Sequence, residues 1–348
     1  MKIAFLTKYT YQGASSRYRV FNYLSFFKNH EMIVDVFPFF GDNYLQVLMN
    51  KSRLVFYLFT FNSIIKRIWL LIKIKGKYDL LVIEKELIHN LPYIFESWLL
   101  SGENYILDFD DYLGASYKCN SLKKIFLSNK IYNLVMNSKF TTVGNRWYFT
   151  ELPEEKLLYL PTVIDMNKYN SNVVFKSNKK QIVWIGSFST VKYLYLIESV
   201  LIKLRQELDF ELKVIGAVFE SPTLDVLNVQ WEEKTEVHEI ATAHVGIMPL
   251  ANELWEKGKC GFKLIQYMAC GLPVVASPEP ANIEIVEHNS NGFIAKSDDE
   301  WYVYLKRLLL DDKLNVEMGT SARKRIENNY TYQIWGERYV DMIKSIKE

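Results

Sequence analysis

The chain has little of what holds small secreted proteins or metal centres together. Its three cysteines, Cys119, Cys260 and Cys270, show no paired spacing, which predicts no disulfide framework and a reducing compartment. No cluster of Cys and His has the spacing of a metal site. With 42 Lys and Arg against 40 Asp and Glu, the chain also lacks a strong positive charge, so no nucleic-acid partner is expected.

No apolar run is long enough to span a membrane. The longest, Leu54 to Ile65, has 12 residues before Lys66 and Arg67 interrupt it, whereas a spanning helix needs ~20. We therefore expect no transmembrane segment. The strand-like run Lys2 to Thr7 leads straight into a loop, so no signal peptide is expected either.

The segment from Lys51 to Lys77 is basic and aromatic, with seven Lys and Arg interleaved with Phe, Trp, Leu and Ile. Two interpretations stay open. The favoured one is a long core helix with a solvated face. The other is a helix that lies on an anionic membrane surface.

The pattern that is present is an alternation of short apolar runs with loops and helix-compatible stretches. In the first half the runs are Lys2 to Thr7, Met32 to Phe37, Tyr78 to Ile83, Tyr105 to Asp108, Lys139 to Val143 and Leu157 to Leu160. This alternation predicts a parallel, doubly wound α/β sheet, with ligands at the carboxyl ends of its strands. In the second half, Gln181 to Ile185, Leu212 to Ile215, Val245 to Leu250 and Val274 to Ala276 are read as strands.

A length of 348 residues fits two such domains. The polar stretch from Asn167 to Lys180 marks the boundary, which gives domains at 1–166 and 181–328 and a final helical segment at 329–348. Residues 1–165 hold 20 Lys and Arg against 15 Asp and Glu, while the remainder holds 22 against 25. The excess of positive charge in the first half favours an anionic partner there.

Two groups of polar residues follow strands of the first half. Gly13 to Arg19 combines a glycine and serines with Arg17 and Arg19, which suits an anionic ligand. Asp108, Asp110 and Asp111 gather three carboxylates within four residues, which indicates either a functional cluster or a magnesium site. The charged turn at Glu84 to Glu86, with His89 beyond it, is a weaker candidate.

The most informative stretch runs from Trp255 to Pro278. Gly258 and Gly261 make a loop that can approach a ligand, Phe262 to Ala269 reads as a short helix, and Val274 to Ala276 reads as a buried strand. A glycine- and lysine-rich loop at a helix N-terminus is suited to hold an anion such as phosphate.

Lys263 to Ser277 resembles the donor-binding segment of glycosyltransferase family four, which has the GT-B fold. The resemblance implies two Rossmann-like doubly wound domains that face each other across a cleft. It also implies a last helix, Tyr330 to Lys347, that crosses back to the first domain with Trp335 and Tyr339 on one side. The expected activity is a metal-independent, retaining transfer of a sugar from a nucleoside-diphosphate sugar, with no cofactor.

Several family residues are replaced in this chain. Gly258 and Gln266 stand where most members have two glutamates, and Ser187 stands where an arginine usually binds the donor diphosphate, while Lys192 matches. Gln266 would hold the donor ribose, so replacing it by Glu is expected to be tolerated and by Leu not. Glu279 would either contact the sugar or face solvent.

Site residues are assigned from these matches. The expected donor-binding residues are Gly186, Ser187, Lys192, Gly258, Lys259, Cys260, Gly261, Phe262, Lys263 and Gln266. The expected acceptor-binding residues are Gly13, Ser16, Arg17, Arg19, Asp110 and Asp111. The expected catalytic residues are Asp110, Lys192 and Lys263.

The acceptor is expected to be a glycan, and a lipid-linked diphosphate sugar would explain both the arginines and the basic segment. That acceptor implies a cytoplasmic protein, peripheral on the inner face of the cell membrane, that builds a cell-surface polysaccharide. Two alternatives are a GT-B sugar-nucleotide epimerase, which the aspartate cluster would serve, and a non-catalytic nucleotide-sugar-binding relative.

Overall fold

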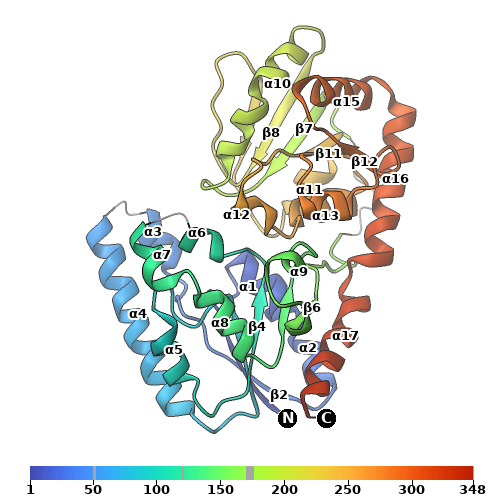
Figure 1. Cartoon of the computed structure of the whole chain (residues 1–348). Coiled ribbons are helices and arrows are strands. Elements are labelled where there is room, and N and C mark those ends of the chain that lie inside the picture. The colour runs from blue at the N-terminus through green and yellow to red at the C-terminus, as the bar shows by residue number, and fades with distance from the viewer. Residues whose placement is uncertain (50–51, 119–120, 170–175, 348) are drawn as a thin grey trace. The chain divides into compact units, whose positions relative to one another are not determined.

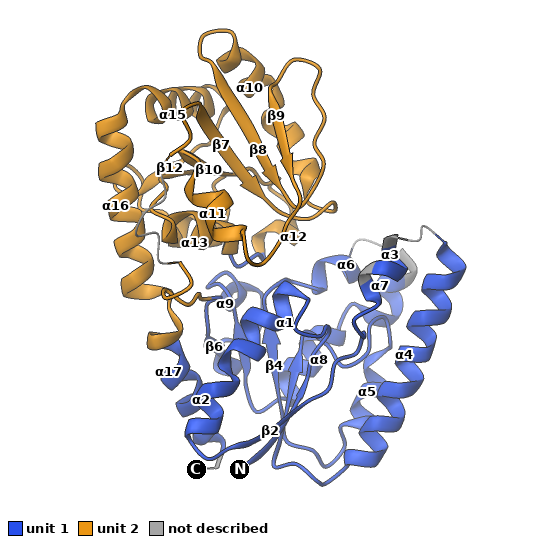
Figure 2. Ribbon diagram, turned by 180° about the vertical axis from the view of Figure 1, so that it is seen from behind, with its two compact units in different colours: residues 1–162, 258–260, 335–348 blue, residues 163–257, 261–334 orange. Residues whose placement is uncertain are grey.

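The chain forms two compact α/β units, each built on a parallel six-stranded sheet (Figures 1 and 2). The computed structural model describes residues 1–49, 52–118, 121–169 and 176–347. The first unit comprises residues 1–162, 258–260 and 335–348, and the second comprises 163–257 and 261–334. Lys51, Cys119 and residues 170–175 of the expected linker lie outside the described residues.

The first sheet has the strand order β2-β1-β3-β4-β5-β6, with every neighbouring pair parallel. Its strands are β1 (Lys2–Leu6), β2 (Ile33–Val36), β3 (Leu80–Glu84), β4 (Tyr105–Phe109), β5 (Thr141–Val143) and β6 (Leu157–Tyr159). The central strands β3 and β4 are buried along their whole length, as continuous apolar runs covered on both faces require. All six predicted strands are therefore confirmed.

The connections of this unit are helical. They are α1 (Ala14–Arg19), η1 (Phe21–Tyr23), α2 (Leu24–Asn29), α3 (Tyr44–Met49), α4 (Arg53–Ile74), α5 (Tyr93–Leu99), α6 (Gly114–Lys118), α7 (Ser121–Leu127), α8 (Lys130–Asn137), α9 (Tyr148–Glu151) and η2 (Glu154–Lys156). Each connection returns the chain to the same end of the sheet. The carboxyl ends of β1, β3 and β4 therefore meet at one edge.

The last helix, α17 (Tyr332–Lys344), ends on the first unit and continues into η4 (Ser345–Lys347). The Tyr339 ring lies edge-on to the rings of Tyr23 and Phe27, with centroids 5.2 Å apart in both pairs. A side chain at Gly336 would come within 2.4 Å of the Phe26 ring, so the helix approaches α2 closely there. The predicted return of this helix to the first unit is confirmed.

The second sheet has the order β12-β11-β10-β7-β8-β9. Its strands are β7 (Lys180–Ile185), β8 (Phe210–Ile215), β9 (Val226–Val229), β10 (Val245–Met248), β11 (Val274–Ala276) and β12 (Gly292–Ile294). Its helices are η3 (Val191–Ile197), α10 (Glu198–Arg205), α11 (Glu236–Ala241), α12 (Leu254–Lys257), α13 (Phe262–Ala269), α14 (Pro280–Ile285), α15 (Asp298–Leu310) and α16 (Asp312–Asn329). The pattern did not predict β9 or β12.

Helix α4 differs from the favoured interpretation of a core helix. Only Ser63, Arg67, Leu71 and Ile74 are buried, while Trp69, Phe61 and other apolar residues of the helix are more than half exposed. By length and composition alone α4 could cross a membrane, which the sequence reading did not expect. However, Arg67 near the middle of α4 donates to the carbonyl oxygens of Thr7 and Phe37. The helix is therefore attached to the chain that follows β1 and β2.

Candidate active site

Serines of α1 bind the carboxylate that ends β3. Ser15 Oγ donates to Glu84 Oε1 at 2.7 Å, and Ser16 Oγ donates to Glu84 Oε2 at 2.6 Å. The backbone N–H of Lys8 also donates to Glu84 Oε2. Burial and the nearby Asp110 nevertheless raise the pKa of Glu84. A buried carboxyl group with a raised pKa is therefore fixed at the edge of the sheet.

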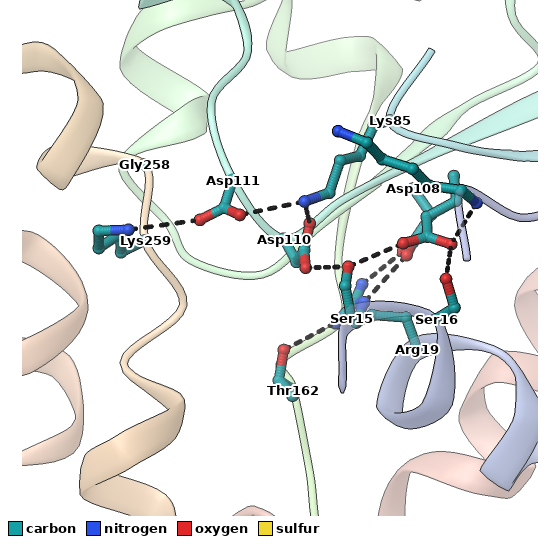
Figure 3. Close-up of polar contacts among 12 residues, drawn as sticks. Ser15, Ser16, Arg19, Lys85, Asp108, Asp110, Asp111, Thr162, Gly258 and Lys259 are labelled. Carbon is teal, nitrogen blue, oxygen red and sulfur yellow. Dashed lines mark hydrogen bonds and ion pairs between the residues drawn. The ribbon is translucent and has the colours of Figure 1, made fainter. Parts of the chain in front are cut away.

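Arg19 lies in the interior beneath this edge. It is 1% exposed, and its guanidinium pairs with Asp108, with Nε at 2.9 Å from Oδ2, and donates to the carbonyl oxygen of Leu160 at 2.6 Å (Figure 3). Burial lowers the pKa of Arg19, but the adjacent Asp108 raises it by more, so the group stays charged. This placement speaks against Arg19 as a ligand for an acceptor phosphate, because its donors are already used.

The other two aspartates share Lys85, which the sequence analysis did not single out. Lys85 Nζ lies 2.9 Å from Asp110 Oδ1 and 3.0 Å from Asp111 Oδ2. Burial lowers the pKa of Lys85, yet the two carboxylates raise it well above its usual value. In turn, burial raises the pKa of Asp111, while Lys85 and Lys259 lower it, to about 2.

The backbone is unusual at Lys85, where φ is 66°. A lysine in the left-handed region is uncommon, and such strain is kept where the surroundings hold it. Here the turn after β3 directs the side chain back to Asp110 and Asp111 (Figure 3). The charged turn, a weaker candidate in the sequence, is therefore part of a largely buried ion-pair network.

The remaining residues expected at the acceptor lie at the same edge. Ser16 accepts a hydrogen bond from the Tyr9 backbone N–H, and a side chain at Gly13 would come within 2.4 Å of Tyr9, so the close approach requires glycine. The Arg17 guanidinium lies over the rings of Tyr11 and Tyr18. These positions are compatible with an acceptor site, and their role stays a prediction.

Residues 258–260, expected to bind the donor, are held by the first unit. Tyr148 Oη donates to the carbonyl oxygen of Gly258, and Asn145 donates to that of Lys259. A side chain at position 258 would come within 2.2 Å of Tyr112, which explains why the glutamate usual in the family does not fit here. Lys259 Nζ lies 3.7 Å from Asp111 Oδ1 (Figure 3). Burial raises the pKa of Cys260.

In the second unit, the loop after β7 carries Gly186 and Ser187. A side chain at Gly186 would come within 2.5 Å of the Trp184 ring, so the chain passes close to this buried indole. Lys192 is exposed on η3, with Nζ 5.2 Å from the centre of the Tyr193 ring. The loop leads into the 3-10 helix η3, which continues as α10.

The start of α13 lies at the same edge, because β10, the strand before it, pairs in parallel with β7. Gly261 precedes the helix with φ of 66°, and Phe262 opens it. Lys263 is partly buried, with Nζ 4.1 Å from the centre of the Trp184 ring. Gly186, Lys192 and Lys263 therefore lie at one edge of the second sheet, where α13 begins, and the start of a helix favours an anion.

Gln266 is more enclosed than the resemblance implied. It is 4% exposed, and its Nε2 donates to Tyr169 Oη at 3.1 Å. Tyr169 Oη donates to Glu236 Oε1 at 3.0 Å, and Trp231 Nε1 donates to Glu236 Oε2 at 2.6 Å. The amide of Gln266 is thus fixed by a chain of hydrogen bonds, with contact to a ribose still a prediction.

Two buried glutamates of the second unit were not predicted as a pair. Glu256 on α12 accepts a hydrogen bond from Tyr193, and Glu279 precedes α14. Each is 3% exposed, and the Oε2 atom of each has no hydrogen-bond partner among the described residues. Burial raises the pKa of Glu279, Lys257 lowers it and Glu256 raises it further. Glu279 therefore does not face solvent.

Within the described ranges, no three His, Cys, Asp or Glu are grouped to hold a metal ion. Asp108, Asp110 and Asp111, the candidates for such a site, are paired with Arg19, Lys85 and Lys259 instead.

Comparison with known proteins identifies the second unit most clearly. Residues 179–311 match a model of the family "Glycosyl transferases group 1". The N-acetyl-alpha-D-glucosaminyl L-malate synthase of Bacillus anthracis is 24% identical over 173 residues, which are 48% of this chain and 45% of that protein. The matches span less than half the length of the curated relatives.

Solved structures match the whole fold. A glycosyltransferase from Rickettsia africae superposes with a TM-score of 0.70 at 13% identity, over 100% of this chain and 98% of that one. HepE of Anabaena, solved in complex with UDP and glucose, superposes with a TM-score of 0.67 at 14% identity, over 99% and 100% of the two chains. The two parallel sheets are thus those of the GT-B fold.

Proposed function

We propose that the chain is a GT-B glycosyltransferase that uses a nucleoside-diphosphate sugar. The premise is its match to the glycosyl transferases group 1 family over residues 179–311. One observation carries the proposal. The family match covers the edge where Lys263, at the start of α13, lies beside the glycine loop after β7. That arrangement suits a diphosphate. The complex of HepE with UDP and glucose supports a donor of this class.

The chemistry proposed for this edge is stabilisation of the leaving group. When the bond between sugar and diphosphate breaks, negative charge develops on the diphosphate oxygens. Lys192 and Lys263 would neutralise that charge, and the positive end of the α13 dipole would stabilise it. We propose that transfer proceeds with retention and without a catalytic metal or cofactor, since the family resemblance implies both.

A thermal-shift screen with UDP, GDP, ADP and TDP tests donor binding. A ligand at 100 times its Kd should stabilise the protein by ~2.7 kcal/mol. Nucleotide release from the matching nucleotide sugar, measured with and without an extract that supplies acceptors, then tests transfer. A transferase releases nucleotide only with the acceptor. No stabilisation by any of the four nucleotides would refute the proposal.

For the acceptor, we propose a lipid-linked glycan at an anionic membrane surface, as part of cell-surface polysaccharide synthesis. Helix α4 lies beside α5, and both carry exposed apolar residues, including Trp69 and Trp98, each about two-thirds exposed. Residues 43–78 and 112–150 contain no Asp or Glu at all. A surface with exposed indoles and unopposed positive charge is suited to an anionic bilayer. The protein would then be cytoplasmic and peripheral.

Sedimentation with vesicles tests the membrane part. The protein should bind vesicles of phosphatidylcholine and phosphatidylglycerol at low salt and dissociate as salt rises. Phe61→Ser with Trp69→Ser should reduce this binding, because both side chains are largely exposed on α4. Ile283→Ser removes an exposed apolar side chain from the second unit and serves as the matched control. Equal binding by wild type and the α4 variant would contradict the proposal.

The alternative of a sugar-nucleotide epimerase loses its main support in this structure. An epimerase needs acid and base carboxylates that are free to approach the sugar. Asp108 is engaged by Arg19, and Asp110 and Asp111 are engaged by Lys85. A non-catalytic nucleotide-sugar binder would be recognised by nucleotide binding without release in the assay above.

A further inference from the structure

A cavity of about 450 Å³ lies in the first unit, beside the charged edge of the sheet. Its walls come from the ends of β1 and β3, from residues 39–44 and from α4, and include Lys8, Arg67 and Tyr57. A second cavity of about 400 Å³ shares Arg67 and Phe39 with the first as lining residues. Nothing in the family comparison assigns either cavity a ligand.

Arg67 is a buried cation without an anionic partner among the described residues. It is 3% exposed; its Nη2 donates to two backbone carbonyl oxygens, and its Nη1 has no hydrogen-bond partner. Burial lowers the pKa of Arg67 to about 9, and the charge of Glu84, with which Arg67 forms no ion pair, acts to raise it. An unpaired buried charge is costly, so an anion in the adjoining cavity would relieve that cost.

Lys8 is the second cation of this cavity. Its Nζ lies 5.5 Å from the centre of the Tyr9 ring and forms no ion pair within the described part of the chain. Burial and the neighbouring Lys85 lower the pKa of Lys8, while Glu86, Tyr44 and Glu84 act to raise it. The wall thus brings together two cations, neither of which forms an ion pair within the described part of the chain.

The carboxylates of the same wall are already engaged. Glu84 accepts hydrogen bonds from Ser15, Ser16 and the Lys8 backbone. Glu86 accepts hydrogen bonds from Lys130, His89 and Tyr117. Lys85, the third cation, is shared by Asp110 and Asp111. Lys8 and Arg67 are therefore the cations left to bind an anionic ligand.

We propose that this cavity binds the phosphate or diphosphate end of the acceptor, with Lys8 and Arg67 as its cationic ligands; the acceptor identity rests on the proposed transferase function. A guanidinium fork and an ammonium group together suit phosphate oxygens. Tyr57 lines the cavity and is also exposed on the apolar surface of α4. A hydrocarbon chain attached to the phosphate could therefore leave the cavity along α4.

Calorimetric titration of the full chain with farnesyl diphosphate, a water-soluble prenyl diphosphate, tests this site. The titration is done with saturating UDP, so that the diphosphate site of the second unit is occupied. Lys8→Gln and Arg67→Gln should each weaken farnesyl diphosphate binding about 10- to 100-fold, the range expected for one charge-assisted hydrogen bond. Lys28→Gln removes an exposed charge from the same unit and should change nothing.

Two further ligands identify the source of the phosphate. Inorganic pyrophosphate with the same dependence on Lys8 and Arg67 would support recognition of the phosphate itself, and a gain in affinity from the farnesyl chain would support the lipid-linked form. Lys8→Gln should fold normally, because the Lys8 side chain forms no ion pair within the described part of the chain. Unchanged affinity of this variant for farnesyl diphosphate would overturn the proposal. Arg67→Lys, which keeps the charge, controls for folding at that position.

Failure of the proposed function is a separate result. If the chain bound none of the four nucleotides but farnesyl diphosphate still depended on Lys8 and Arg67, the phosphate site would stand without the transferase. If UDP bound normally and farnesyl diphosphate bound equally well to all variants, the cavity assignment would fall and the donor site would remain.

Discussion

Lys263 and Lys192 carry the donor chemistry in this proposal, although the structure gives them different surroundings. Lys263 lies over the buried Trp184 ring, whereas Lys192 is exposed. Replacing either by Ala should weaken nucleotide binding about 10- to 100-fold, because one charge-assisted contact to phosphate is lost. Nucleotide Kd values measured by titration check this prediction.

Lys296→Ala offers the control, because Lys296 is exposed in the same unit and its charge should not reach the ligand. A thermal melt of each variant separates loss of contact from loss of folding. If Lys263→Ala bound nucleotide within twofold of wild type, Lys263 would no longer be a phosphate ligand.

Gln266 shows how the structure revises an expectation about a single residue. Tyr169 gives its one hydroxyl proton to Glu236, so it needs a donor at position 266, which Gln supplies and ionised Glu does not. Gln266→Glu, expected from the family pattern to be tolerated, should therefore lower the free energy of unfolding by about 1–3 kcal/mol.

The companion change Glu236→Gln should restore that loss. Its amide could donate to Tyr169, Tyr169 could then donate to Glu at 266, and the amide oxygen could still accept from Trp231. Denaturant unfolding of both single variants and the double variant measures the coupling. If the two single changes lowered the free energy of unfolding additively in the double variant, the hydrogen bonds of Gln266, Tyr169 and Glu236 would not be coupled.

The elements that the sequence predicts best are those whose local pattern and tertiary role agree. Phe262 to Ala269 was expected as a helix and is α13 to the residue, because Gly261 and Gly271 bracket a strong apolar face. Strand β9 was missed, since its short run lies at the sheet edge with two exposed central residues. Local periodicity is weak in such a strand.

The candidate site was predicted less completely, for a physical reason. Gly258, Lys263 and the aspartates could be read from spacing and resemblance. Lys85 and Arg67 could not, because a lysine after a strand and an arginine in a basic helix look solvated in sequence. The positive φ at Lys85 and the hydrogen bonds of Arg67 to the chain just after β1 and β2 bring these two cations inside.

Three elements of the first unit meet at a buried lysine. Lys130 of α8 lies between Glu86, after β3, and Glu96 of α5, and all three side chains are at most 5% exposed. One cation cannot fully compensate two buried carboxylates. Burial therefore raises the pKa of Glu96 to about 7 despite the charge of Lys130. Burial also acts to raise the pKa of Glu86, but the hydrogen bond from His89 and the charge of Lys130 outweigh it and lower that pKa to about 2.

This arrangement predicts a pH dependence of stability. Because the folded pKa of Glu96 lies above its unfolded value of 4.5, its stabilising contribution is complete below about pH 4.5 and is lost as pH rises through 7. Between pH 4.5 and 8, wild type should lose about 3 kcal/mol relative to Glu96→Gln, which mimics the protonated form.

Urea unfolding of both proteins across that range gives the difference directly, and other titrating groups cancel in the comparison. Parallel pH curves for wild type and Glu96→Gln would show that Glu96 stays ionised in the folded protein.

At the scale of the whole molecule, the two proposals place anion binding in two separate parts of the chain. The second unit offers Lys192 and Lys263 at a helix start. The first unit offers Lys8 and Arg67 in a cavity that adjoins the exposed face of α4. A transferase that joins a soluble donor to a lipid-linked acceptor needs both kinds of site, one for each substrate.

This division predicts that membrane binding and donor chemistry can be separated by mutation. Phe61→Ser with Trp69→Ser removes two apolar side chains that would enter the bilayer, each worth about 1.5–3 kcal/mol when buried. The variant should therefore lose most of its activity toward acceptor lipid presented in anionic vesicles. UDP binding and transfer to a detergent-solubilised or short-chain acceptor should stay within about twofold of wild type, because neither residue lines the larger cavity.

Nucleotide release with each of the two acceptor forms, in vesicles and in detergent, measures this difference in activity, and Ile283→Ser is the control. An equal loss in both formats would mean that the α4 surface supports the acceptor site rather than the membrane, and full activity in both would mean that the lipid reaches the enzyme without this surface.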